Sequence, residues 1–526
     1  MRLSTKHSNQ QIVEYRDFSG GLNTSNASEM IAHNELARAI NVEIDKPTGL
    51  IRTVAGTRTL YQKEGAYFTD IAYDKIGDMF VVCDIDKKIY VWKEPDLSEA
   101  IEAKWIDQKA KYLLNIWKES DLQEIGTLTG NLTPSFCLWE DGLLIASGGA
   151  LQYFKNGEVH TISETSLVKC NGVFVRGGRV WTYSGDTLYT SAVGDEESWV
   201  SDPADASTAQ WITIGYKDGG EIVGVVSLSS DVLIVKDNGH VFRLSGEYPD
   251  WTVKEVSREV TCRGYRASVG IINNAVILGD SFMQTISTTE DYGDMHATDI
   301  SAKVKNEIAA LPKKVKLRYV APYNQIWLVD GDRRFLFLEL DNNAYFEREY
   351  TTALMDVCYK GNKVFALKKD KIQILDSDSE FDEDDFLKWR WRAKTLVSNN
   401  AYVVKRGRAD ITPIIDHYHE CVFVIGKAEL HGSFQNLSHC LYEDYSPLYY
   451  NKRELFTPPI NAEYLSSDEL FLNSEYLFEN ETKLFSLNQF RTDDRFIERL
   501  RSVKVESYGQ GGQLIFNGIN FEIAEV

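Results

Sequence analysis

A unit of three short β-strands recurs along most of this chain, and it constrains the possible folds more than any other feature. In residues 221–246, three runs rich in β-branched and aromatic residues are separated by Ser229-Ser230 and by Asp237-Asn238-Gly239. Asn-Gly between two such runs predicts a hairpin, because both residues tolerate positive φ. One three-stranded unit cannot bury its own apolar face, so neighbouring units must pack against it.

The same plan begins again near residues 67, 135, 172, 222, 267, 317 and 354. A repeat of roughly 40–50 residues built from antiparallel strands is typical of β-propeller blades. We therefore predict an all-β chain with a β-propeller of six to eight blades over residues 61–376. Two β-sandwiches would also give short strands with regular turns, but seven copies favour the propeller.

The remaining residues predict a second β-rich domain, formed by the N-terminal segment 1–60 and the C-terminal third 387–526. Helices are expected only over 34–40, with Asn34 as N-cap, over 99–118 and over 302–311, which ends before Pro312. Residues 376–385 carry seven acidic side chains. They lack the Gly and Glu positions of a calcium-binding loop, so we expect a solvated linker over 377–386.

Composition limits the classes of function. The formal net charge is −21, which argues against ordinary nucleic-acid binding. The seven cysteines form no CxxC pair and are expected to be buried thiols. No secretory signal or membrane-spanning segment is predicted.

Two histidines near the C-terminal third invite a metal hypothesis. His417 and His419 are two residues apart, close to Glu420 and Cys421. No further ligand is placed by spacing, so we expect histidines that face solvent or an interface. No metal and no cofactor is predicted.

The N-terminal segment has a recognisable order of motifs: DFSGGLNTS from Asp17, then ELARAINVEID from Glu35, then GLIRTVAGTRTL from Gly49. Together with TLYTSAVGDEESW at 187–199 and the strand-rich end 500–526, this order resembles tail hub or nozzle proteins of short-tailed bacteriophages. That family includes tail tubular protein B and packaged-DNA stabilisation proteins. The motifs touch both ends and the middle of the chain.

The resemblance implies a structural virion protein, assembled in the host cytoplasm, that forms a homohexameric ring around the DNA ejection channel. Implied partners are adaptor, fibre or spike proteins of the tail, and double-stranded DNA that passes without sequence-specific binding. An acidic bore would repel phosphate and let DNA slide. We predict that Phe18, Gly20, Gly21 and Asn41 dock subunits, so that deleting residues 1–30 would impair assembly more than folding. A plain β-hairpin start to a domain explains the same residues equally well.

Residues 431–490 differ in composition and alternate poorly. Acidic residues outnumber basic ones nine to three over 436–490. We predict an insertion that narrows the channel exit, with gate candidates Tyr442, Glu443, Asp444, Tyr445, Tyr449 and Tyr450. A self-packed surface excursion is the alternative.

The motifs of common enzymes are missing from the sequence, including GxSxG, HExxH and the phosphate-binding Gly-Lys-Ser/Thr. We therefore do not expect an enzyme. The alternative from another class is a propeller that binds or cleaves a surface glycan. It would need a carboxylate pair at the propeller mouth or an aromatic platform.

Overall fold

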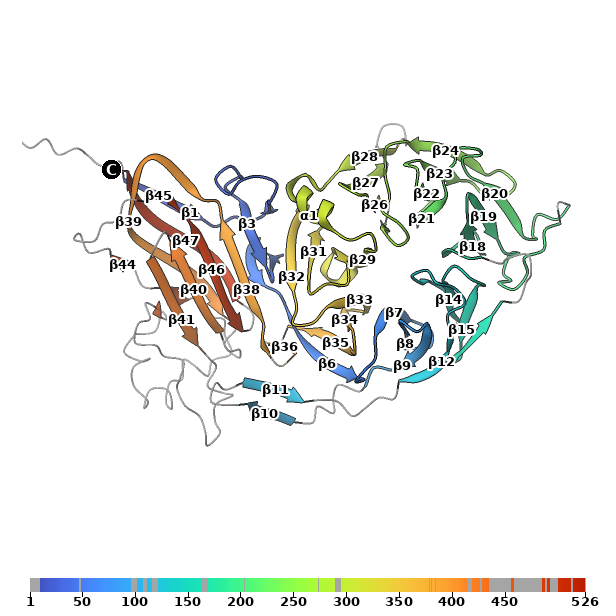
Figure 1. Ribbon diagram of the computed structural model, residues 1–526, viewed down its shortest axis with the longest axis horizontal. Coiled ribbons are helices and arrows are strands. Elements are labelled where there is room, and N and C mark those ends of the chain that lie inside the picture. Colours follow the sequence, from blue (N-terminus) through green and yellow to red (C-terminus); the bar gives the residue numbers. More distant parts are fainter. Residues whose placement is uncertain are drawn as a thin grey trace, which may run out of the picture.

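The computed structural model describes residues 10–46, 49–95, 102–106, 111–115, 122–162, 169–202, 204–272, 274–288, 295–377, 379, 381–383, 385–413, 419–425, 428–434, 456–457, 485–487, 490–491, 500–511 and 514–525. Within these residues the fold is all-β apart from short helical turns. A ring of blades lies beside a two-sheet sandwich (Figure 1).

The described residues form seven four-stranded antiparallel blades, within the predicted range of six to eight. Each blade starts with its inner strand. The first four blades are β7 (Phe68–Asp74), β8 (Met79–Asp84), β9 (Lys88–Trp92) and β12 (Gln123–Thr127); β13 (Ser135–Trp139), β14 (Gly142–Ala146), β15 (Gln152–Lys155) and β16 (Glu158–Thr161); β17 (Val173–Arg176), β18 (Arg179–Ser184), β19 (Thr187–Thr190) and β20 (Gln210–Thr213); β21 (Ile222–Ser227), β22 (Val232–Lys236), β23 (Val241–Ser245) and β24 (Thr252–Ser257).

Three further blades complete the ring. They are β25 (Ser268–Ile271), β26 (Asn274–Leu278), β27 (Met283–Thr288) and β28 (Met295–Asp299); β29 (Lys316–Val320), β30 (Gln325–Val329), β31 (Arg334–Glu339) and β32 (Ala344–Glu349); β33 (Leu354–Lys360), β34 (Lys363–Lys368), β35 (Lys371–Asp376) and β6 (Gly56–Gln62). The seventh blade takes its outer strand from the N-terminal segment. The propeller therefore starts at Gly56 rather than at residue 61.

The sandwich combines both ends of the chain, as predicted. One sheet contains β1 (Gln10–Tyr15), β4 (Val42–Asp45), β5 (Leu50–Thr53), β39 (Leu396–Pro413), β42 (Phe456–Thr457), β43 (Phe485–Leu487), β44 (Phe490–Arg491), β45 (Leu500–Val503) and β47 (Leu514–Glu525). The facing sheet contains β2 (Gly21–Leu22), β3 (Glu35–Ile40), β38 (Lys388–Ala393), β40 (His419–Ile425), β41 (Ala428–Phe434) and β46 (Val505–Gly511). Trp389, Trp391 and Phe423 pack edge-on against Phe516 between the sheets.

One sheet runs from the propeller into the sandwich. β3 pairs with β32, the outer strand of blade six, in parallel at Ile40 and Glu347, and it pairs antiparallel with β38 on its other side. The two units therefore share backbone hydrogen bonds as well as side-chain packing.

Two of the three expected helices are wrong. Residues 35–40 form β3, because pairing partners on both sides and burial of Leu36, Ala39 and Ile40 override local helix propensity. Within 99–118 the chain forms β10 (Glu102–Ile106) and β11 (Lys111–Asn115), an antiparallel pair with Trp105 opposite Tyr112.

The third helix is confirmed, as the 3-10 turn η2 (Ala302–Val304) followed by α1 (Lys305–Ala310). A further turn, η3 (Ala321–Tyr323), joins β29 to β30. No helix in the described part of the chain is long and apolar enough to cross a membrane.

The acidic stretch is not a solvated linker in its described part. It forms β36 (Phe381–Asp382) and β37 (Asp385–Phe386), and the two phenylalanine rings stack with centroids 4.8 Å apart. Buried Asp382 accepts hydrogen bonds from the Thr57 hydroxyl at 3.1 Å and from the backbone N–H of Thr351. The linker prediction used only the density of acidic residues. That density does not reveal that Thr57 of β6 and Thr351, which follows β32, donate hydrogen bonds to the Asp382 carboxylate.

Candidate functional site

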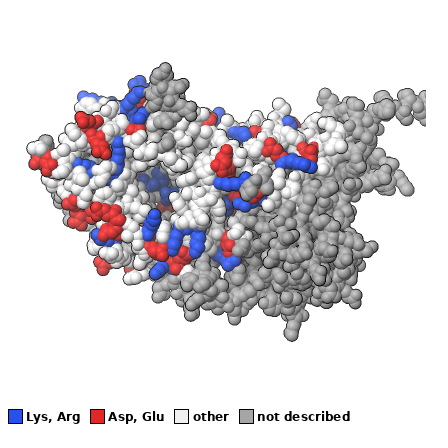
Figure 2. Space-filling view, turned by 180° about the vertical axis from the view of Figure 1, so that it is seen from behind, with Lys and Arg blue, Asp and Glu red and all other residues white. Residues whose placement is uncertain are grey.

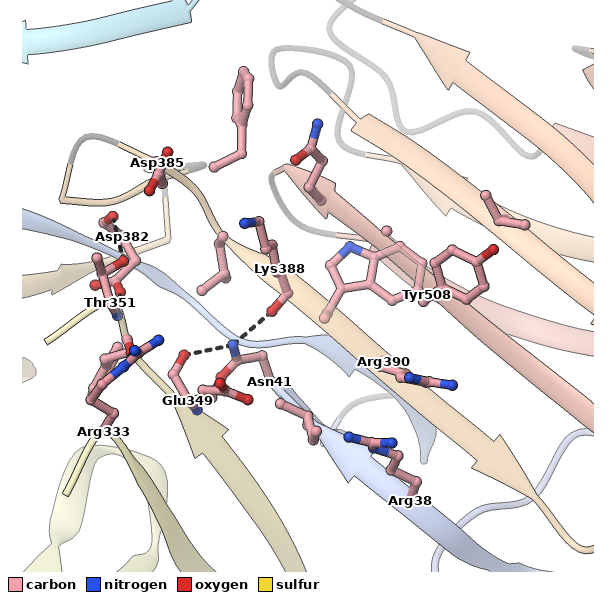
Figure 3. Close-up of a pocket in the computed structure, with 18 of the residues that line it drawn as sticks. Arg38, Asn41, Arg333, Glu349, Thr351, Asp382, Asp385, Lys388, Arg390 and Tyr508 are labelled. Carbon is pink, nitrogen blue, oxygen red and sulfur yellow. Dashed lines mark hydrogen bonds between the residues drawn. The ribbon is translucent and has the colours of Figure 1, made fainter. Parts of the chain in front are cut away.

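Asn41 joins the propeller to the sandwich with one buried side chain. It follows β3 in the left-handed conformation, with φ of 53°, which Asn tolerates better than most residues. Its Nδ2 donates to the carbonyls of Glu349 at 2.8 Å and Lys388 at 2.7 Å, and its Oδ1 accepts from the Glu349 N–H at 2.8 Å. The side chain thereby bridges blade six and β38, as Figure 3 shows.

The other three docking candidates lie in the same joint. Phe18 is 1% exposed and its ring centroid is 5.3 Å from that of Trp391. Gly21 has φ of 65°, and a Cβ there would meet the Ala344 Cβ at 2.8 Å, so only glycine lets this backbone approach blade six. A Cβ on Gly20 would meet the Glu35 side chain at 2.6 Å. These contacts lie within one chain; docking between subunits stays a prediction.

A buried ionic group strengthens the joint. Glu43 on β4 forms ion pairs with Arg52 at 2.9 Å and with fully buried Arg348 of blade six at 3.2 Å. Gln325 donates to the same carboxylate at 3.0 Å. Burial opposes the charged form, but the two guanidinium groups hold the pKa of Glu43 below its usual range. Breaking such a pair would leave an uncompensated buried charge.

Beside the joint lies a cleft of about 870 Å³ between blade six, the β36–β37 hairpin and the outer face of the β3–β38–β46–β40 sheet. Figure 3 shows its labelled lining, with Arg38, Arg390 and Tyr508 on one side. Basic and acidic side chains are mixed along its walls: Arg38, Arg333, Lys388, Arg390, Glu349, Asp382, Asp385 and Glu506. Its volume falls within the usual range of small-molecule pockets.

The propeller axis holds a second polar cluster, where the inner strands begin. Arg318 of blade six binds Asp356 of blade seven through two hydrogen bonds of 2.7 and 2.9 Å. Lys316 pairs with Asp70 of blade one at 2.5 Å. Burial alone would raise the pKa of Asp356, but Arg318 and Lys316 hold it below its usual range. Both carboxylates are therefore committed to ion pairs.

Arg266 closes the axis further. It precedes β25 in blade five, in the left-handed region with φ of 69°. Its guanidinium donates to the carbonyls of Pro134 at 3.1 Å and Thr133 at 2.9 Å, before blade two, and of Asn171 at 3.0 Å, before blade three. Figure 2 shows a hollow on the propeller with basic atoms in its depth. One side chain thus ties three blades together across the axis.

Other predicted residues are only partly placed. Tyr442, Glu443, Asp444, Tyr445, Tyr449 and Tyr450 lie outside the described residues, as does His417. Cys421 is buried on β40. Among the described residues, six cysteines lie outside disulfides, four of them buried, and no cluster of three metal-binding side chains occurs.

The cleft residues Arg38, Arg390 and Tyr508 were missed by the sequence reasoning. The alternation of KWRWR over 388–392, which separates bases from tryptophans on a strand, was the available signal.

No protein-family profile and no curated protein matches the chain. Similar solved structures include a computationally designed protein, Ika8, with 11% identity and a TM-score of 0.34 over 60% of this chain and 98% of that one. Others are the Pan2 WD40 domain of Neurospora crassa, with 8% identity and a TM-score of 0.38 over 62% and 95%, and the Cps50 (Swd1) β-propeller domain of Myceliophteria thermophila, with 9% and 0.38 over 60% and 98%. The propeller assignment rests on the strand order itself.

Proposed function

We propose that this chain is a structural subunit of a bacteriophage tail, a nozzle or hub protein that assembles into a ring around the DNA ejection channel. The observation that carries the proposal is where the N-terminal signature lies. Residues 17–58 run through the sandwich, pair with blade six and enter the closing strand of blade seven. The motifs that resemble the phage family are thus the ones that hold the architecture together.

The axial cluster favours a scaffold over the glycan-cleaving alternative. A glycosidase needs two carboxylates free to act as acid and base or nucleophile. Asp70 and Asp356 sit near the propeller mouth, but both are buried and paired with Lys316 and Arg318. These groups stabilise the ring of blades, so the propeller serves as a rigid body.

In a ring of six copies, each copy would contribute a formal net charge of −21 to the assembly around the channel. Such a ring repels DNA phosphates and favours passage over retention by the wall. The proposed setting is the virion tail, with neighbouring tail proteins as partners and homohexamers as the assembly.

The test is a reconstruction of the purified protein and of the virion that encodes it. Rings of six around an axial channel, found at the tail, would support the proposal. A chain that is absent from virions, or that stays monomeric there, would rule it out. Glycan-array binding by the monomer would favour the alternative instead.

A further inference from the structure

Three basic side chains meet at the propeller axis. Lys316 and Arg318 are two residues apart on β29, so both face the same side of that strand. Arg266 joins them from blade five, because its carbonyl accepts a hydrogen bond of 2.9 Å from the N–H of Leu317, the residue between them. We call Arg266, Lys316 and Arg318 the axial bases. Figure 2 shows basic atoms in the depth of the hollow on the propeller.

The carboxylates at the axis do not balance all three charges. Asp356 accepts both hydrogen bonds of Arg318, and Asp70 pairs with Lys316 at 2.5 Å. Each carboxylate is buried and engaged with one base. Among the described residues, the axial bases therefore keep one positive charge without a counter-charge.

Arg266 is the base without an ion pair. Within the described part of the chain, its guanidinium contacts backbone carbonyls and, at 3.4 Å, the Tyr183 hydroxyl. Burial, the largest influence, lowers the pKa of Arg266, and the charge of Arg318 lowers it further, while Tyr183 and Asp70 act in the opposite direction. Burying a cation is costly unless an anion balances it.

The cluster can still be reached from outside. Arg318 uses Nε and Nη2 for Asp356, and its Nη1 has no partner among the described residues. Its side chain is 23% exposed, and that of Lys316 is 16% exposed. Because β29 is the inner strand of blade six, a small molecule in the axial hollow can contact these groups.

We propose that the axial bases bind a small oxyanion, a carboxylate or a phosphate, in the hollow of the propeller. The planar guanidinium of Arg318 presents donors that match the oxygens of either group. Nucleic acid fits less well, because the surplus is one positive charge and duplex binding neutralises many phosphates. A neutral sugar would leave the charge of Arg266 unbalanced. The site needs only one folded chain, so it is independent of the proposed ring.

Calorimetric titration of the full-length protein tests the site. Inorganic phosphate and acetate are titrated separately, with chloride at equal ionic strength as the blank. We expect saturable binding of at least one of them in the millimolar range or tighter. Binding of phosphate alone would assign the site to phosphate-bearing ligands, and binding of acetate alone would assign it to carboxylates. No binding of either anion beyond the blank would overturn the inference.

Asn171→Asp tests whether the axial bases are the binding groups. The Asn171 carbonyl accepts from Arg266 at 3.0 Å, and its side chain donates to the Tyr265 hydroxyl at 3.2 Å. A carboxylate at this position would supply the missing counter-charge, so the affinity should fall about tenfold or more. Asn343→Asp adds the same charge in an exposed turn and should change the affinity by less than about twofold. Unchanged binding in Asn171→Asp, or equal losses in both variants, would overturn the inference.

Arg318→Lys gives a second measurement if Asn171→Asp does not fold. Lysine keeps the charge beside Asp356 but loses the planar set of donors, so the affinity for the anion should fall about threefold or more. Unchanged affinity would show that Arg318 does not contact the anion and would overturn the inference.

Discussion

Asn41 shows how much of the architecture one small side chain can hold. Its amide group makes three hydrogen bonds to two strands, while its backbone N–H donates to the Glu347 carbonyl and its carbonyl accepts from Val54. Asn is suited to this position because it combines tolerance of the left-handed region with two donors and an acceptor. Glycine would keep the backbone conformation but lose every side-chain bond.

We expect Asn41→Gly to destabilise the protein by about 3 kcal/mol, because two partly buried carbonyls and one N–H lose their partners. Asn343→Gly is the matched control. Asn343 has nearly the same φ, 51°, but is exposed in a turn, so its loss should cost no more than about 0.5 kcal/mol. Urea unfolding followed by fluorescence measures both. Equal effects at the two positions would show that the bonds of Asn41 contribute little.

We expect Lys368 to make the folding stability depend on pH. It is fully buried, donates to the Thr352 carbonyl at 3.1 Å and lies against the Tyr350 ring. Burial lowers the pKa of Lys368 to about 7, against the pull of Asp382 and Glu383. The unfolded chain keeps this proton up to about pH 10. Between these values the unfolded state binds more protons, so stability must rise with pH.

We therefore expect Lys368→Met to flatten the rise in unfolding free energy between about pH 7 and pH 10. Methionine has no titrating group, so the folded and unfolded states no longer differ in proton binding at this position. Unfolding midpoints across this range measure the effect. Exposed Lys313→Met serves as the control and should leave the profile as in the unmodified protein. A Lys368→Met profile parallel to that of the unmodified protein would contradict the prediction.

Among the elements, the N-terminal strands are the ones that the rest of the fold depends on. β1 pairs with β47 along six residues, β3 joins the two units, and β6 closes blade seven. Tyr15, Phe18 and Leu22 are all buried in the core. The expectation that deleting residues 1–30 would impair assembly more than folding stays a prediction, but the burial of these residues argues against it, because the deletion would remove core packing.

We expect deletion of residues 1–30 to abolish cooperative folding, whereas deletion of residues 1–9, which precede β1, should leave the melting transition in place. Phe18→Ala alone should cost about 3–5 kcal/mol, as is usual for a buried aromatic ring. Differential scanning calorimetry separates these outcomes. A sharp, unshifted transition after deletion of 1–30 would show that the N-terminal strands are dispensable.

At the scale of the whole molecule, a sheet that runs from blade six into the sandwich joins the closed propeller to the sandwich. The axial contacts of Arg266 connect blades five, two and three, and Asn41 and Glu43 fix blade six to the sandwich.

The gate predicted for the insertion at residues 431–490 concerns the whole assembled molecule. We expect replacement of residues 436–487 by a short Gly/Ser linker to leave the propeller folded, because the described strands of the propeller lie between Gly56 and Asp376. Virions carrying the change should lose packaged DNA or fail to join the next tail part. Genome retention and plating efficiency measure this, with the unmodified phage as control. Normal retention and infection would end the gate hypothesis.

What the sequence determined by itself was the repeat. Local turn chemistry such as Asn238-Gly239 and short β-rich runs set the hairpins, since hairpin formation depends on neighbouring residues. The all-β class, the blade range and the joining of both ends into one β-domain followed from this. The helix before Pro312 was equally local.

The tertiary structure alone decided the remaining features, because they depend on partners far along the chain. Residues 35–40 became a strand only by pairing with β32 and β38, about 300 residues away. Asp382 was buried because Thr57 and Thr351 supply donors. The alternation of bases and tryptophans over residues 388–392 was present in the sequence, but the cleft beside Lys388 and Arg390 arose only when blade six came to lie next to β38. Long-range pairing and burial are not encoded in any single window of sequence.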